Sequence, residues 1–240
     1  MKPFDSQKGN DSLTLVLSVN RAKLCGDAGL AIMKRSNLPI VDARCVMIAN
    51  AYCLHWSTPL RSCMRSLLQG YKTGMKMGAL DSASWCIHFY LEYYFYSGGR
   101  LALLFSDWTT YVKQMEDYDA QLALVIMKVT LHIIARLRGV ADETEEVEYE
   151  TLCEEKGEDT LKCVFKRTQM YVATLFGDHE KTAKIALEWQ PKVMAALPAQ
   201  VNGLEVTFLS ALSGMAYSRQ NPKNKKYLKH AKMCMKKIKG

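Results

Sequence analysis

The 240-residue sequence lacks a hydrophobic segment long enough to cross a membrane. Its longest uncharged run, Cys45–Leu60, contains Asn50, His55 and Pro59 and is shorter than the roughly 20 apolar residues that a spanning helix needs. Residues 1–12 contain no apolar core of the kind found in signal peptides. We therefore expect a soluble protein and a cytoplasmic location.

The cysteines lack the spacing that metal and redox sites need. The eight of them include no Cys-x-x-Cys pair, and the closest pairing with histidine is Cys53 with His55. A structural zinc site needs four convergent ligands at characteristic spacings, which the sequence does not offer. Most of the cysteines fall within apolar helical patterns, where a free thiol behaves as a small hydrophobic side chain. We expect buried, reduced thiols and no cofactor.

Sequence motifs of common catalytic sites are also missing. There is no Gly-rich phosphate-binding loop, no G-x-S-x-G turn and no H-E-x-x-H pair, and the five histidines are widely separated. The acidic residues at 116–119 are similar to the magnesium-binding clusters of all-helical isoprenoid synthases. They lack the spacing and the second cluster, so acidic groups at a helix N-terminus are the preferred interpretation. These absences favour a non-enzymatic protein.

Apolar residues do recur at steps of three and four along nearly the whole chain, as is typical of amphipathic α-helices. No window alternates apolar and polar residues, so almost no strand is expected. The pattern predicts about eleven helices in a single helical-repeat domain over residues 12–239, with residues 1–11 disordered. Short connections make neighbouring helices antiparallel.

Glycine stands at several of the predicted junctions between one helix and the next. The examples are Gly26, Gly78, Gly98 with Gly99, and Gly177. A glycine turn that joins paired helices, repeated along the chain, is typical of an α-solenoid. We therefore predict an all-α fold built as a solenoid of antiparallel helix pairs.

Residues 80–115 are predicted to form the centre of this stack. The first of two helices here is apolar on all sides and must be covered on both sides. Its aromatic residues Trp85, Phe89 and Tyr93 could line an apolar pocket of an all-helical enzyme, which would also need convergent carboxylates or a metal. A packed core is the preferred interpretation, because aromatic side chains at helical spacing dominate cores.

Two helices near the C-terminus have apolar stripes that predict their buried faces. In the first, Asn202 is expected to cap a helix whose stripe is Leu204, Phe208, Ala211, Leu212 and Met215. In the second, the stripe is Leu228, Ala231, Met235 and Ile238.

The net charge of +8 is unevenly distributed along the chain. An acidic insert at 139–160 holds ten acidic residues and one lysine; a solvated loop is the preferred interpretation, and a docking surface for basic partners is the alternative. The last helix is basic, and it could lie on an anionic membrane or bind nucleic acid. A solvated face of a terminal helix is the preferred interpretation there. The lysines of this basic surface are Lys225, Lys226, Lys229, Lys232, Lys236 and Lys239.

Taken in order, the helices resemble the tetratricopeptide-like helical region of very large signalling proteins. The matching stretches are Trp56–Pro59, Leu67–Gly74, Met77–Gly98 and Leu204–Leu212. In those proteins this region follows an AAA-type ATPase module and precedes sensor, histidine-kinase or cyclase modules, and some members begin with a serine/threonine kinase domain. The acidic insert departs from the family pattern.

The resemblance implies a right-handed α-solenoid that serves as a protein-interaction or regulatory module beside ATPase or kinase modules. Members of this family have no catalytic residues in this region, so none is implied here. The family continues with further helix pairs, so the chain is expected to be a fragment of such a protein or a free-standing relative. Protein partners are therefore the expected ligands.

Overall fold

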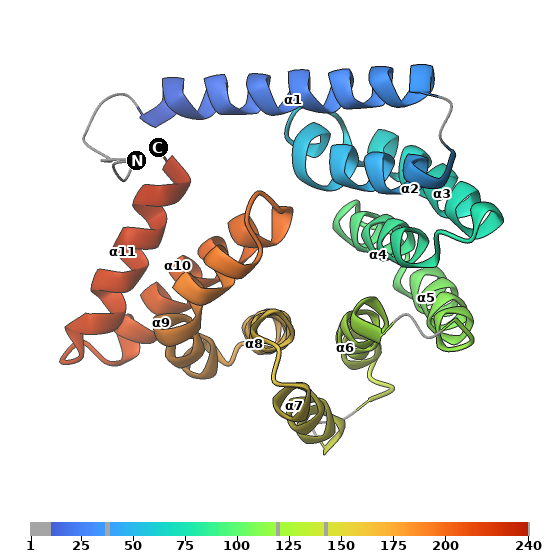
Figure 1. Ribbon diagram of the computed structural model, residues 1–240. Coiled ribbons are helices and arrows are strands. Elements are labelled where there is room, and N and C mark those ends of the chain that lie inside the picture. Colours follow the sequence, from blue (N-terminus) through green and yellow to red (C-terminus); the bar gives the residue numbers. More distant parts are fainter. Residues whose placement is uncertain (1–10, 37–38, 119–120, 142–143, 240) are drawn as a thin grey trace.

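The computed structural model describes residues 11–36, 39–118, 121–141 and 144–239, and these ranges contain helices and connections but no strand (Figure 1). The prediction of an all-α protein with about eleven helices is confirmed for this part of the chain. Of the segment expected to be disordered, residues 1–10 lie outside the described ranges, whereas Asp11 begins the first helix. The elements are α1 Asp11–Ser36, α2 Pro39–Ile48, a π-helical turn η1 Ala49–Cys53, a 3-10 turn η2 Leu54–Trp56, α3 Leu60–Met77, α4 Leu80–Tyr96, α5 Leu101–Glu116, α6 Gln121–Leu137, α7 Thr144–Lys156, α8 Asp159–Leu175, α9 His179–Ala196, α10 Val201–Gln220 and α11 Lys225–Lys239.

Consecutive helices pack against each other along much of the chain, most extensively α3 on α4, α8 on α9, α9 on α10, and α10 on α11. The path curves, so that in Figure 1 the first helix (blue) and the last helix (red) come near each other. Contacts distant in sequence close the curve, since the Trp56 indole N–H donates to the carbonyl oxygen of Ala199 at 3.2 Å.

Three of the predicted glycine turns have the backbone conformation that favours glycine. Gly78, Gly98 and Gly177 have φ values of 73°, 72° and 82°, a left-handed region that other residues rarely adopt. Gly26 is different, because it lies within α1, where two separate helices were expected. A Cβ atom there would lie 2.9 Å from Leu54 Cδ2, so this glycine allows close packing and does not turn the chain.

Helix α4 is covered on both sides, as its sequence predicts. It contributes Phe89 and Tyr93 to a cluster with α2, η1 and α3, and Ile87 and Leu91 to another cluster with α5 and α6. Trp85 packs against a third cluster formed mainly by α6, α8, α9 and α10. This helix therefore joins the main apolar clusters of the fold.

Gly70 and Gly74 of α3 let α2 and α4 approach this helix closely. A Cβ on Gly74 would lie 2.9 Å from the Cβ of Ala83 and 3.0 Å from that of Ala43, closer than two such atoms can pack. A side chain there would require α2 or α4 to shift. Only the tertiary arrangement shows why this glycine is needed, because in sequence it stands within a helical pattern.

We predict that Gly74→Ala lowers the free energy of unfolding by about 1–3 kcal/mol, the usual cost of overpacking. The matched control is Gly29→Ala in α1, where an added Cβ meets no atom within 4 Å. The control should be neutral or stabilising by up to about 1 kcal/mol, because alanine favours helix more than glycine does. Urea titrations of both variants would measure the difference, and equal effects would contradict the packing argument.

The acidic insert at 139–160 was expected to be a solvated loop, and this was wrong. Its central part forms helix α7, which packs on α8. Glu146 accepts hydrogen bonds from Lys181 at 2.9 Å and from Gln169 at 2.7 Å. Burial raises the pKa of Glu146, but these neighbours and Arg136 outweigh it and lower the pKa overall. Glu146 is therefore held by side chains of α8 and α9.

Candidate functional site

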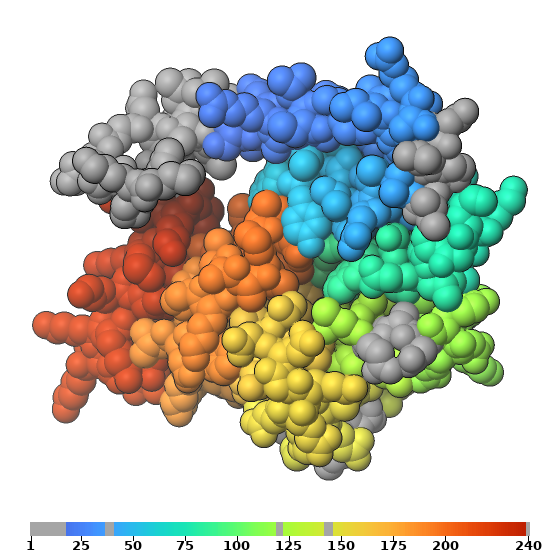
Figure 2. Space-filling model, viewed as in Figure 1, coloured from blue at the N-terminus to red at the C-terminus, as the bar shows by residue number. Residues whose placement is uncertain are grey.

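An apolar groove lies between α1, α10 and α11. It encloses about 580 Å³, and Figure 2 shows the surface hollowed between α1 (blue) and α10 (orange). Residues of the first half of α1 and of the end of α11 both line this groove, so residues far apart in sequence meet there. Lys237 is the one charged residue among the described residues that line it. The lining residues are Ser18, Val19, Ala22, Tyr52, Trp56, Met194, Leu197, Ala199, Gln200, Gly203, Leu204, Thr207, Lys237 and Ile238.

The predicted buried face of α10 is exposed at three of its large side chains, whereas its Ala211 is buried. Leu204, Phe208 and Leu212 are 47%, 56% and 40% exposed, and they lie on one side of the helix at four-residue steps. The face that packs on α8, α9 and α11 carries smaller and more polar residues, including Ser210 and Gly214. Small side chains let the helices approach closely, so packing selected that face over the more apolar one.

The basic surface of α11 is placed as the sequence predicts. Lys225, Lys226, Lys229, Lys232 and Lys236 are exposed, and the side chain of Lys239 lies outside the described residues. The buried face is formed by Tyr227, Ala231 and Cys234. The predicted stripe is therefore confirmed at Ala231 and displaced elsewhere, since Leu228 and Ile238 are exposed at its edges. None of the five exposed lysines forms an ion pair with an acidic residue in the described part of the chain.

A buried charged network joins α4, α8 and α10 beside the groove. Arg167 Nη1 donates to Glu92 Oε1 at 3.0 Å and to the Tyr96 hydroxyl at 3.0 Å, and it lies 3.7 Å from Glu205 Oε2. The side chains of Arg167 and Glu92 are 4% and 3% exposed. Because isolated buried charges are costly, this pair must be formed for the helices to pack.

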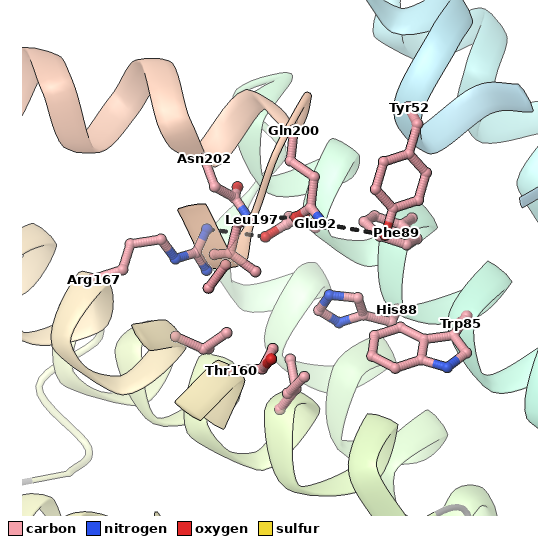
Figure 3. A pocket seen from close by; sticks show the side chains of 13 residues that line it. Tyr52, Trp85, His88, Phe89, Glu92, Thr160, Arg167, Leu197, Gln200 and Asn202 are labelled. Atoms are coloured by element: carbon pink, nitrogen blue, oxygen red, sulfur yellow. Dashed lines mark hydrogen bonds and ion pairs between the residues drawn. The ribbon is translucent and has the colours of Figure 1, made fainter. Parts of the chain in front are cut away.

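Hydrogen bonds extend the network toward the α9–α10 connection (Figure 3). The Tyr96 hydroxyl lies 2.8 Å from Asn202 Oδ1 and 2.9 Å from Glu205 Oε2. The Asn202 amide donates to Gln200 Oε1 at 3.2 Å, and Gln200 Nε2 donates to the Tyr52 hydroxyl at 3.2 Å. Asn202 was expected to cap α10 but lies within its first turn, where its side chain links α10 to α4.

Burial shifts the titration of this network. Desolvation raises the pKa of Glu205, and the opposing effects of Arg167 and Tyr96 do not cancel it. Desolvation alone would lower the pKa of Arg167, but Tyr96, Glu92 and Glu205 outweigh it and raise that pKa. Arg167 is thus a permanent cation beside the carboxyl groups of Glu92 and Glu205, and the raised pKa of Glu205 favours its protonated form.

A cavity of about 100 Å³ adjoins this network (Figure 3). It lies between α4, α8 and the α9–α10 connection, and its lining includes His88, Glu92 and Arg167. Desolvation lowers the pKa of His88, which keeps its imidazole neutral. The cavity therefore combines a compensated ion pair, a neutral imidazole and aromatic walls.

The aromatic residues Trp85, Phe89 and Tyr93, which could line an enzyme pocket, are divided by the fold. Trp85 and Phe89 line this cavity, whereas Tyr93 faces the opposite cluster and donates to the carbonyl oxygen of Asn50 at 3.1 Å. One carboxylate, Glu92, lines the cavity beside them. Sequence reasoning missed Glu92 and Arg167, although Glu92 is the one Asp, Glu, Lys or Arg residue within the apolar run 82–99.

All eight cysteines are free, and five of them are buried. Among the described residues, no three or more His, Cys, Asp or Glu side chains are placed to hold a metal ion. In the same ranges, no helix combines the length and apolar character needed to cross a bilayer.

Compared with models of protein families, with curated proteins and with solved structures, the chain gives no significant match.

Proposed function

We propose that this protein is a non-enzymatic interaction module that binds a helical segment of another protein in the groove between α1, α10 and α11. The observation that carries the proposal is the groove of about 580 Å³ with its largely apolar lining. Apolar side chains of a partner helix would fill the groove and extend over Leu204, Phe208 and Leu212, whose four-residue spacing suits a helix lying alongside α10. Exposed apolar stripes of this kind are typical of interaction surfaces.

The charges favour an acidic partner. Lys237 borders the groove, and the neighbouring face of α11 carries exposed lysines that have no acidic partner within the described chain. Acidic residues that flank the apolar anchors of a partner helix would lie against this basic face. Such charge pairs steer association and are weakened by salt.

We propose in addition that the packed antiparallel neighbours form a right-handed α-solenoid of the tetratricopeptide-like kind. The successive contacts between helices along the chain support this. The sequence resemblance to helical regions of large signalling proteins points to an adjacent ATPase or kinase module, or to a protein regulated by one, as the source of the partner segment. A cytoplasmic location agrees with this role.

A synthetic peptide pair would test the proposed groove. One 16-residue amphipathic peptide would carry leucines at helical spacing with glutamates between them, and its counterpart would carry lysines in place of the glutamates. Fluorescence anisotropy should show binding of the glutamate peptide, weaker binding at high salt, and little binding of the lysine peptide. Leu204→Glu should weaken binding at least tenfold, because it places a carboxylate in the apolar wall.

The matched control is Leu103→Glu on α5. Leu103 is 50% exposed, close to the 47% of Leu204, and does not line the groove. This control should bind the peptide as the unchanged protein does. Equal losses in both variants, or equal binding of both peptides, would overturn the proposal. Binding to anionic vesicles or nucleic acid without binding to the glutamate peptide would also overturn it and assign α11 to those ligands.

A further inference from the structure

The cavity beside the charged network has room for a small molecule. Its volume of about 100 Å³ exceeds the roughly 30 Å³ that one water occupies in the liquid. The side chains that dominate it are buried, since His88 and Arg167 are 4% and 3% exposed as whole residues. The polar groups that line it are therefore held in place by the surrounding helices.

Several of these polar groups have unused hydrogen-bonding capacity. Arg167 makes its hydrogen bonds and ion pairs within the described chain through Nη1, so its Nη2 group donates to no described residue. Glu92 accepts from Arg167 at Oε1, and no described residue donates to its Oε2. The Nδ1 atom of His88 and the Nε atom of Arg167 also have no partner, but protein atoms cover them, so a ligand in the cavity does not reach them. A ligand that pairs with Arg167 Nη2 and Glu92 Oε2 gains hydrogen bonds that the described chain leaves unmade.

The arrangement of donors and acceptors selects the ligand. The Nη2 group of Arg167 offers N–H donors, and Glu92, which accepts from Nη1 of the same guanidinium, offers an acceptor at Oε2. A complementary ligand carries an acceptor next to a donor, as a carbonyl does beside an amide N–H. The aromatic side chains of Trp85 and Phe89 on the cavity wall suit a planar group.

The charge of the surroundings excludes an anion. Arg167 is already balanced by Glu92, and burial favours the protonated form of Glu205 and the neutral form of His88. A carboxylate ligand would bring an additional negative charge into a buried space, which costs much more than an uncharged polar group.

We propose that this cavity is a binding site for a small uncharged amide or urea, whose carbonyl oxygen accepts from Arg167 and whose N–H donates to Glu92. The site lies beyond the groove assigned to the protein partner and does not depend on that assignment. Tyr52, Leu197 and Gln200 line both spaces, so the cavity and the groove share a wall. The hydrogen bond between Gln200 and Tyr52 lies in the shared wall.

A set of small ligands of similar size would test this assignment. The probe is 2-imidazolidinone, a cyclic urea, and the control is cyclopentanone, a ring with the same number of non-hydrogen atoms but without the N–H groups. Chemical-shift changes in the protein's ¹H–¹⁵N spectrum should report saturable binding of the cyclic urea. Cyclopentanone should bind at least about tenfold more weakly, because it leaves the Glu92 acceptor unpaired.

Cavity-filling variants locate the binding. Ala196→Leu adds carbon atoms at the wall without altering the charged network, and Thr160→Leu does so from the other side. Either variant that folds, as judged by its thermal unfolding, should lose binding of the cyclic urea at least tenfold. The proposal is overturned if cyclopentanone binds as tightly as the cyclic urea, if acetate binds more tightly than both, if none of the three binds, or if a folded cavity-filling variant keeps full affinity.

Discussion

Replacing both Glu92 and Glu205 with glutamine should lower the free energy of unfolding by about 3–5 kcal/mol, the cost of leaving a buried charge without its partner. Arg167 is 4% exposed in its side chain, and it cannot lose its proton under ordinary conditions. With both carboxylates removed, the guanidinium has only neutral groups such as the Tyr96 hydroxyl around it. Urea denaturation at neutral pH would measure the loss.

The losses of unfolding free energy in the two single variants should add up to less than the loss in the double variant. In Glu92→Gln, Glu205 lies 3.7 Å from the same guanidinium nitrogen and can ionise to balance it. In Glu205→Gln, the pair of Arg167 with Glu92 stays intact. A double-mutant cycle should therefore give a coupling free energy of about 0.5–3 kcal/mol, as is usual within one network. Strict additivity would contradict the shared balance of charge.

Glu205→Gln should also change how stability depends on pH. Desolvation raises the folded-state pKa of Glu205 above the value of 4.5 expected for the unfolded chain. The folded state thus binds this proton more tightly than the unfolded chain does. The stabilisation from protonated Glu205 is therefore fully present below about pH 4.5 and is lost as pH rises through the folded-state pKa. Glutamine mimics the protonated form at every pH. Compared with this variant, the unchanged protein should become progressively less stable above pH 4.5, and parallel curves would contradict the assignment.

Replacing Trp108 with alanine should lower the free energy of unfolding by about 3–5 kcal/mol. The side chain is fully buried between α5 and α6, and its indole N–H donates to the carbonyl oxygen of Met127 at 2.9 Å. Truncation removes a large apolar area, leaves a cavity and breaks the hydrogen bond that links the two helices. Thermal and urea unfolding, monitored by far-UV circular dichroism, would measure the change.

The control for this variant lies on the same helix. Leu103 is 50% exposed, so Leu103→Ala should change the free energy of unfolding by no more than about 0.5 kcal/mol. Because both changes shorten a side chain within α5, the comparison separates burial from helix propensity. A cost for Leu103→Ala close to that of Trp108→Ala would contradict the placement of the α5 core face.

The face of α5 that enters the core could be predicted from its sequence, whereas that of α10 could not. In α5, Leu104, Trp108 and Met115 lie on one face at helical spacing. Burying this face covers the apolar stripe and leaves the polar residues of the helix in solvent. In α10 the apolar stripe competes with a face of glycine and serine that fits more closely between α8, α9 and α11. The face with glycine and serine is the one that packs against these helices, so Leu204 lines the groove.

The charged network was equally beyond prediction from local patterns. Glu92 and Arg167 are 75 positions apart, and an acidic residue on an apolar helix gives no indication of which cation will neutralise it. The acidic insert shows the same principle on a larger scale. Its composition predicted a solvated loop, but the basic residues that bind it, such as Lys181, lie on helices elsewhere in the chain.

The sequence by itself determined the all-α fold, the approximate number of helices, three of the glycine turns, the central position of α4 and the exposed lysines of α11. These features follow from hydrogen bonds within each helix, from φ preferences and from side-chain periodicity, all of which act over a few residues. Only the tertiary structure decided that α10 presents its apolar face to a groove, and that Arg167 meets Glu92 and Glu205 beside a cavity. Those outcomes depend on how several helices pack together at once, because each buried face and each buried charge takes its partner from distant parts of the chain.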